Sequence, residues 1–116
     1  MSLEFRSIKE GRAIAPWVRA LKGKSGCYII REKNGFLFFA GEVLYIGESH
    51  SGRLKTTLLR HFQRWTGKIA GPTFAALKVE VAVVRCPASR AIALQYSIIE
   101  EYRPRLNNAA NPDAEK

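Results

Sequence analysis

Two tyrosines stand beside glycines in neighbouring apolar stretches, and phenols so placed could move a proton near an approaching phosphate. Residues 26–28 read Gly-Cys-Tyr, and residues 45–47 read Tyr-Ile-Gly. Because side chains alternate along a β-strand, Tyr28 and Tyr45 can point to one side of a hairpin, with Tyr45 on the same face as Val43. Gly47 has no Cβ, so it would let a phosphate or a backbone come close. Two tyrosines in the core of an ordinary hairpin are the alternative.

Basic side chains accompany the next segment, where the hydrophobic period changes from two to about 3.6 residues. This change predicts an amphipathic helix after Gly52. Its apolar stripe consists of Leu54, Leu58, Phe62 and Trp65. Beside that stripe lie Arg53, Thr57, Arg60 and Arg64, with His61 at the border. A guanidinium is always charged and donates from a planar fork, which suits it to hold a phosphate. A solvated basic face is the alternative.

A glutamine interrupts the apolar stripe of the last predicted helix. The stripe consists of Ala91, Leu94, Ile98, Ile99 and Tyr102. Gln95 falls inside this stripe at helical spacing, and a polar side chain there needs a partner or a ligand. A structural glutamine that is hydrogen-bonded in the core is the alternative to a ligand-binding role.

The elements that must position these side chains begin with a helix and a hairpin. Apolar residues between positions 8 and 21 recur at roughly helical spacing, which predicts a short helix before a turn. Strands over 26–32 and 36–47 should pair through a tight turn at Asn34-Gly35. The interruption of the second strand predicts a bulge near Gly41.

Three further elements follow the basic helix. Residues 68–73 should form a loop, and the alternation over 77–85 predicts a third strand. A last helix should start at 87–89 and end at 102–103, because Pro104 disfavours helix in the residue before it. This order predicts an α+β fold in which helices pack a small three-stranded antiparallel or mixed sheet.

The charge balance indicates a polyanionic partner. The chain has 19 Lys and Arg residues against 10 Asp and Glu residues, a formal net charge of +9. Nucleic acid is favoured over a membrane surface, since no helix combines a basic face with a broad apolar one. No apolar run approaches the roughly 18 residues of a membrane span, and the charged N-terminus lacks a signal-peptide core, so we expect a cytoplasmic protein. Cys27 and Cys86 should be free thiols, and their spacing to His50 and His61 argues against a zinc site.

The two tripeptides, in this order on one predicted hairpin, resemble the two halves of the signature of the GIY-YIG nuclease superfamily. The resemblance continues through the basic helix and the third strand to residues 104–107, Pro-Arg-Leu-Asn, which are similar to the family's closing Pro-x-x-Asn. We therefore expect a GIY-YIG-like nuclease domain over 24–108, an N-terminal helical extension over 1–23 and a flexible tail over 109–116. Cys27 stands where the motif's name has Ile and keeps a small apolar side chain.

The resemblance implies a metal-dependent DNA endonuclease, a hydrolase that cleaves phosphodiester bonds with one Mg²⁺ or Mn²⁺ ion. In this chemistry Tyr45 or Tyr28 helps to deprotonate the attacking water, and His61 belongs to the hydrogen-bond chain. An arginine holds the scissile phosphate. The family's usual arginine position falls on Thr57 here, so that role passes to Arg53 or Arg60.

The metal position is the clearest departure from the family pattern. The family's metal-binding glutamate falls on Gln95, counted back from Pro104 and Asn107. An amide offers one neutral oxygen and no charge, so Mg²⁺ binding should be much weaker. The resemblance also implies DNA contacts at Gly47, Arg64 and Asn107. A catalytically inactive nucleic-acid-binding module on the same fold is the alternative, and the sequence leaves the oligomeric state open.

Overall fold

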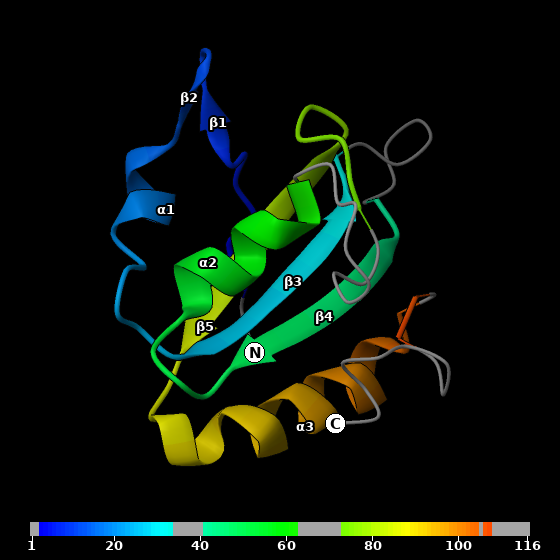
Figure 1. Ribbon diagram of the computed structural model, residues 1–116. Coiled ribbons are helices and arrows are strands. Elements are labelled where there is room, and N and C mark those ends of the chain that lie inside the picture. Colours follow the sequence, from blue (N-terminus) through cyan, green and yellow to red (C-terminus); the bar gives the residue numbers. More distant parts are fainter. Residues whose placement is uncertain (1–2, 34–40, 63–72, 105, 108–116) are drawn as a thin grey trace.

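The computed structural model describes residues 3–33, 41–62, 73–104 and 106–107, and the statements below refer to these residues. The molecule is an α+β fold built on a three-stranded antiparallel sheet with the strand order β4-β3-β5 (Figure 1). The strands are β3 (Gly26–Glu32), β4 (Val43–Ser49) and β5 (Val79–Arg85). This sheet confirms the predicted fold class and resolves its strand direction as antiparallel.

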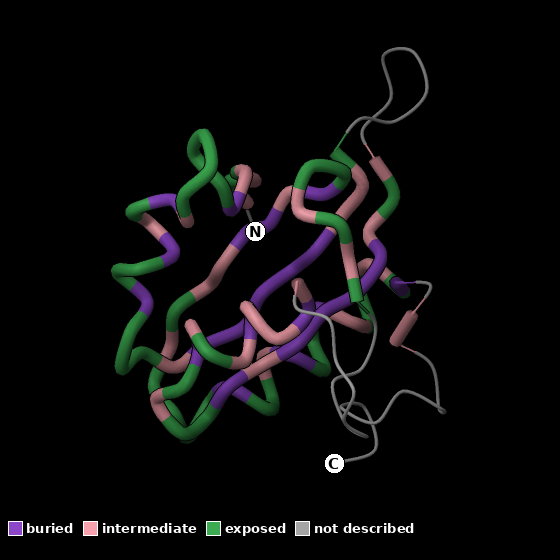
Figure 2. Tube along the Cα trace, turned by 45° about the horizontal axis from the view of Figure 1, so that its top comes forward, coloured by how far each residue is buried: buried purple, intermediate pink, exposed green. Residues whose placement is uncertain are grey.

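Strand β3 is central in the sheet and buried from Gly26 to Ile30. Its short, continuous apolar run is typical of a strand that is covered on both faces. Figure 2 shows the buried residues running along this part of the chain. The positions of both tyrosines are therefore fixed by the most buried element of the fold and its neighbour β4.

Helices cover the two faces of the sheet. Helix α2 (Leu54–Leu59) continues into a one-turn 3₁₀ helix, η1 (Arg60–Phe62), and packs with Tyr28, Ile30 and Tyr45. Helix α3 (Ala91–Tyr102) follows the 3₁₀ helix η2 (Ala88–Arg90) and packs with Cys27, Ile29 and Ile46 on the other face. Alternation along β3 thus sends its side chains into two separate cores, as expected for a sheet between helices.

The ends of both helices follow the local signals of the sequence. At the start of α2, the Ser49 hydroxyl accepts a hydrogen bond from the backbone N–H of Arg53 (3.1 Å), and the Lys24 carbonyl accepts one from Leu54 (3.0 Å). Helix α3 ends at Tyr102, and Arg103 adopts a left-handed conformation (φ 47°) before Pro104. The predicted end of the last helix is confirmed, and the proline explains why the chain turns there.

The expected bulge is present, but it lies at Leu44 rather than at Gly41. Ile30 pairs with Tyr45 and Arg31 pairs with Val43, so Leu44 is the extra residue on β4. The insertion places Leu44 and Tyr45 in the same core, while Val43 packs on the opposite face. The expectation that Tyr45 shares a face with Val43 is therefore wrong, because one extra residue reverses the alternation beyond it.

The predicted helix over residues 8–21 is also wrong in its first half. Strands β1 (Lys9–Glu10) and β2 (Ala13–Ile14) form a small hairpin, and Gly11 occupies its turn with φ 65°. Only α1 (Pro16–Arg19) is helical, with its proline in the first turn, where proline is favoured. The helical spacing arose because residues of the hairpin and of α1 bury their side chains in one core, which includes Ile8, Val18 and Leu21.

This N-terminal segment completes the main core of the domain. Ile8 and Val18 are buried in the same cluster as Tyr28. Arg6 forms two backbone hydrogen bonds with Val81 of β5 (2.9 and 2.8 Å). Residues 1–23 were expected to form a helical extension, but their described part is joined to the sheet and shares its core.

Several expectations fall outside the described residues: the turn at Asn34-Gly35, the start of the return strand at 36–39, Trp65 and Arg64 of the basic helix, the loop over 68–72 and the tail over 109–116. None of the helices in the described ranges is long and apolar enough to cross a lipid bilayer.

Candidate active site

Three rings from different elements meet beneath α2. The Tyr28 hydroxyl and the Nε2 atom of His61 are joined by a buried hydrogen bond of 2.7 Å. The ring of Tyr45 lies 4.8 Å from that of His61 and 6.3 Å from that of Tyr28, measured between centroids. The sequence predicted two tyrosines on one side of the hairpin and a nearby histidine, and the structure brings these three residues together.

This ring cluster is closed to solvent. Tyr28 and Tyr45 are 0% exposed and His61 is 1% exposed. A Cβ atom on Gly47 would overlap the ring and hydroxyl of Tyr28, so the space that this glycine leaves is filled by a tyrosine. The expectation that Gly47 leaves room for a phosphate is therefore wrong on this face. Neither phenol reaches a phosphodiester in this arrangement unless the covering side chains move.

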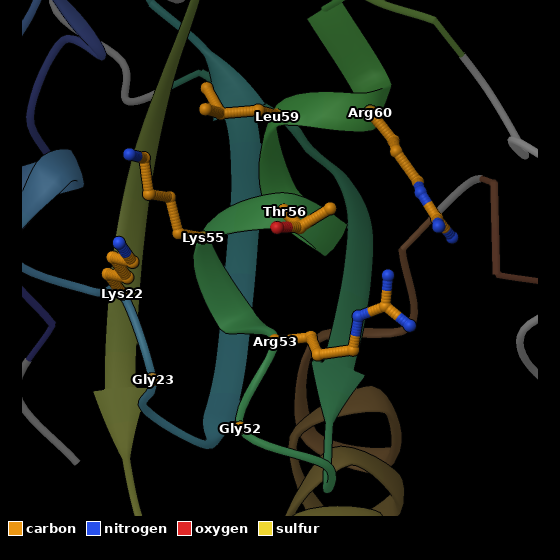
Figure 3. Close-up of a pocket in the computed structure, with 8 residues that line it drawn as sticks. All are labelled: Lys22, Gly23, Gly52, Arg53, Lys55, Thr56, Leu59 and Arg60. Atoms are coloured by element: carbon orange, nitrogen blue, oxygen red, sulfur yellow. The ribbon is translucent and has the colours of Figure 1, made fainter.

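The two arginine candidates, Arg53 and Arg60, precede His61 in the same helical segment. Arg53 and Arg60 line one open pocket of about 690 Å³ that runs along α2. Their side chains extend to the same side of the helix, whereas Lys22 and Lys55 extend to the other (Figure 3). All four cationic residues line the pocket, with the two arginine side chains together on one side of α2 and the two lysine side chains on the other. Thr57, at the family's usual arginine position, does not line it.

The two lysines of this pocket were missed by sequence reasoning. Lys22 lies in the turn before β3, and Lys55 lies on a different side of the helix from Arg53 and Arg60. The pocket unites them because the turn at Gly23 packs against the turn at Gly52. A contact between two turns that are distant in sequence leaves no periodic signal.

Gln95 holds a backbone group of the edge strand. Its side chain is 2% exposed, and its Nε2 atom donates a hydrogen bond to the carbonyl oxygen of Ile46 at 3.1 Å. Asn107 donates to the same carbonyl from Nδ2 at 2.7 Å, and its Oδ1 atom accepts a hydrogen bond from the Ile46 N–H. Gln95 and Asn107 therefore fix the middle of β4 from outside the sheet. The DNA contact expected of Asn107 stays a prediction, and its amide already has this structural task.

The residues around Gln95 do not fit a magnesium site. Mg²⁺ prefers oxygen ligands that include carboxylates, whereas the amide of Gln95 points its donor group at a carbonyl. Within the described ranges, no three His, Cys, Asp or Glu side chains gather closely enough to hold a metal ion. Glu100 and Glu101, the nearest acidic residues along α3, are both exposed. No catalytic step through a metal ion follows from this arrangement.

Both cysteines are free thiols, as expected. Cys27 is buried and donates from Sγ to the carbonyl oxygen of Ala91 at 3.3 Å. Burial, with smaller contributions from Cys86 and Glu48, raises the pKa of Cys27 to about 12. Burial also raises the pKa of Cys86, and Arg90 partly opposes that shift. Neither thiol is activated as a nucleophile, because the thiolate is the reactive form.

No protein-family model matches the chain, and no curated protein matches it at a significant level.

Proposed function

We propose that this chain is a DNA-binding domain of the GIY-YIG type, in which the glutamine at the metal position weakens or silences cleavage. The observation that carries the proposal is the pocket along α2, which is lined by Arg53 and Arg60 from one side of the helix and by Lys22 and Lys55 from the other. Among the described residues, those that line this pocket include no acidic side chain, so its field favours an anion. The overall charge of +9 acts in the same direction.

Phosphate contacts explain this arrangement better than a generally solvated surface. The arginines stand seven residues apart in the sequence, about two helical turns, so their side chains extend to one side of α2 (Figure 3). Two guanidinium groups in one recess can donate to the oxygens of one phosphodiester or of adjacent ones. Such contacts position a nucleic-acid backbone without reading its sequence.

Phosphodiester cleavage is the second candidate function, and the ring cluster is the observation that favours it. Tyr28, Tyr45 and His61 are in mutual contact, and they are residue types that can pass a proton to or from a water molecule once the covering side chains move to admit one. The arginine pocket borders the same helix and could neutralise charge on the phosphate. Gln95 supplies none of the negative charge that a divalent ion needs.

Two measurements test the proposal. DNA binding should be measurable by fluorescence anisotropy at low salt and should weaken steeply as salt rises. The double variant Arg53→Ala/Arg60→Ala should lose most of this affinity, while Lys33→Ala/Lys78→Ala, with the same charge loss away from the pocket, should lose little. Equal losses in the two variants, or affinity independent of salt, would overturn the proposal.

Nicking of supercoiled plasmid separates the two candidate functions. We expect little or no nicking by the native chain with Mg²⁺ or Mn²⁺. Turnover by the native chain that Tyr45→Phe abolishes would instead establish the nuclease. In that case Arg53→Ala and Arg60→Ala, tested singly, would identify the arginine that holds the phosphate, because its loss should depress turnover far more than binding.

A further inference from the structure

A second pocket adjoins the one along α2, and a third pocket adjoins the second. The second pocket, of about 460 Å³, shares Gly23 with the first and is also lined by Lys24 and Arg85. The third, of about 290 Å³, shares Arg85 with the second and is also lined by Arg6 and Trp17. The three recesses therefore follow one another from α2, past the turn at Gly23 and the end of β5, to α1.

The lining of this path has one sign of charge. Lys22, Arg53, Lys55 and Arg60 line its first part. Lys24 and Arg85 line its second part, and Arg6 and Arg85 its third. No acidic residue of the described ranges lines any of the three recesses. Arg6 pairs with Glu4 at 3.3 Å and stacks on Trp17, so the cations that extend the first pocket are above all Lys24 and Arg85.

We propose that Lys24 and Arg85 form a second phosphate-binding site. This site would hold the same nucleic-acid strand as Arg53 and Arg60, but on the other side of the Gly23 turn. This inference rests on the proposed function and extends it from one pocket to a path. The strand would cross the start of α2 and then pass the end of edge strand β5. Lys22, which belongs to the segment 1–23 that the sequence assigned to a separate extension, lines the first part of this path.

A nucleic acid fits this path better than an anionic membrane does. Membrane-surface binding combines cations with an adjoining apolar face that enters the lipid. The exposed large apolar side chains of the described ranges are Leu77, Ile92 and Tyr96. None of them lines the path, and Ile92 and Tyr96 belong to α3, on the face of the sheet opposite α2. Recessed cations in a row match the regular phosphates of a nucleic-acid strand.

The backbone geometry allows both side chains to be removed without disturbing the fold. Lys24 and Arg85 are exposed. Arg85 pairs with Gly26 through its backbone, which alanine would preserve. Lys33 and Lys78 provide a matched control, because they are exposed, lie at the opposite end of β3 and β5, and line none of the three pockets.

The experiment compares the salt dependence of DNA affinity for the native chain, Lys24→Ala/Arg85→Ala and Lys33→Ala/Lys78→Ala. Each lost phosphate contact lowers the slope of log affinity against log salt by about 0.9 on duplex DNA, so two contacts account for about 1.8. Between 50 and 200 mM salt, the Lys24→Ala/Arg85→Ala protein should therefore lose roughly twelvefold less affinity than the native chain. The control should keep the native slope. Thermal unfolding followed by circular dichroism checks that all three proteins are folded.

The possible outcomes separate this inference from the proposed function. If Arg53→Ala/Arg60→Ala weakens binding but Lys24→Ala/Arg85→Ala behaves like the control, the proposed second phosphate-binding site is wrong, and the proposal of DNA binding at α2 is retained. If the native chain does not bind DNA at 50 mM salt, both are wrong. Vesicles rich in phosphatidylserine give the last test. Vesicle binding that depends on Lys24 and Arg85, without a change in DNA affinity, would overturn the nucleic-acid assignment.

Discussion

Gln95→Glu is the most informative single substitution in this chain, because it converts the observed amide into the carboxylate that metal binding would need. In the native structure Gln95 donates from Nε2 to the Ile46 carbonyl at 3.1 Å, and its side chain is 2% exposed. A carboxylate in this place has no donor and would put negative charge beside a carbonyl oxygen. The variant therefore loses the hydrogen bond to Ile46 and gains a buried carboxylate. Together these changes should lower the free energy of unfolding by about 2 kcal/mol at pH 8.

The cost should depend on pH with a defined sign. Burial and the Ile46 carbonyl should raise the pKa of the introduced carboxyl above its value in the unfolded chain. The folded variant then keeps a proton that the unfolded chain releases above about pH 4.3, so its stability falls as pH rises through this window. Below the window, the protonated carboxyl can donate to Ile46 as the amide does. We expect the variant to approach the native free energy of unfolding near pH 4.

Gln95→Met is the matched control, since it removes the donor without adding charge. The Ile46 carbonyl would keep its hydrogen bond from Asn107 (2.7 Å), so this variant should lose only about 1 kcal/mol, at all pH values. Urea unfolding at pH 4 and pH 8 measures both variants. A Gln95→Glu protein as stable as Gln95→Met at pH 8, or with no dependence on pH, would refute the account of Gln95 given above.

Magnesium provides a second readout of the same substitution. Under the nuclease hypothesis, Gln95→Glu should bind Mg²⁺ more strongly than the native chain, because a carboxylate at position 95 supplies the charge that the amide lacks. At a Mg²⁺ concentration of about 100 times the dissociation constant, the stabilisation would be about 2.7 kcal/mol. Gln95→Met should not respond. A Gln95→Glu protein that neither gains stability from Mg²⁺ nor nicks DNA would count against the nuclease hypothesis. The proposal of DNA binding without cleavage would then be retained.

Two further substitutions or treatments test the surroundings of the site. Gly47→Ala places a methyl group against the ring of Tyr28 and should lower the free energy of unfolding by about 1–3 kcal/mol, measured by urea unfolding. A variant as stable as the native chain would contradict this contact. With Ellman's reagent at pH 8, at most one thiol per folded chain should react rapidly, because Cys27 is buried and its pKa is raised to about 12. Both thiols should react after unfolding. Rapid reaction of two thiols in the folded chain would contradict the burial of Cys27.

The parts of the fold that sequence reasoning predicted well are those with a strong local period. The run at residues 26–30, the alternation over β5 and the stripe of α3 each depend on near neighbours in the chain, and each forms the expected element. Burial of Gln95 within the α3 stripe was predicted for the same reason. Its partner was not, because Ile46 is 49 residues away and contributes only a backbone carbonyl.

The errors arose where local signals were ambiguous or long-range contacts decided the outcome. Between residues 8 and 21, a hairpin and a single helical turn bury their side chains in one core, which mimics the spacing of one helix. The bulge at Leu44 depends on the register of β4 against β3, and that register reverses the face of Val43. The filling of the space above Gly47 by Tyr28 likewise follows from cross-strand pairing.

The contacts along the two edges of the sheet also affect whether copies of this chain can pair with one another through their edge strands. An unpaired strand edge can accept a strand from a second molecule and so begin aggregation. On the outer side of β4, the Leu44 carbonyl and both polar backbone groups of Ile46 are already occupied by Leu106 and Asn107. On the outer side of β5, Arg6 occupies both backbone groups of Val81. The segments before β1 and after α3 therefore block the addition of a strand at both edges of the sheet. A chain that has lost either segment by proteolysis would expose an edge strand that can pair with another molecule.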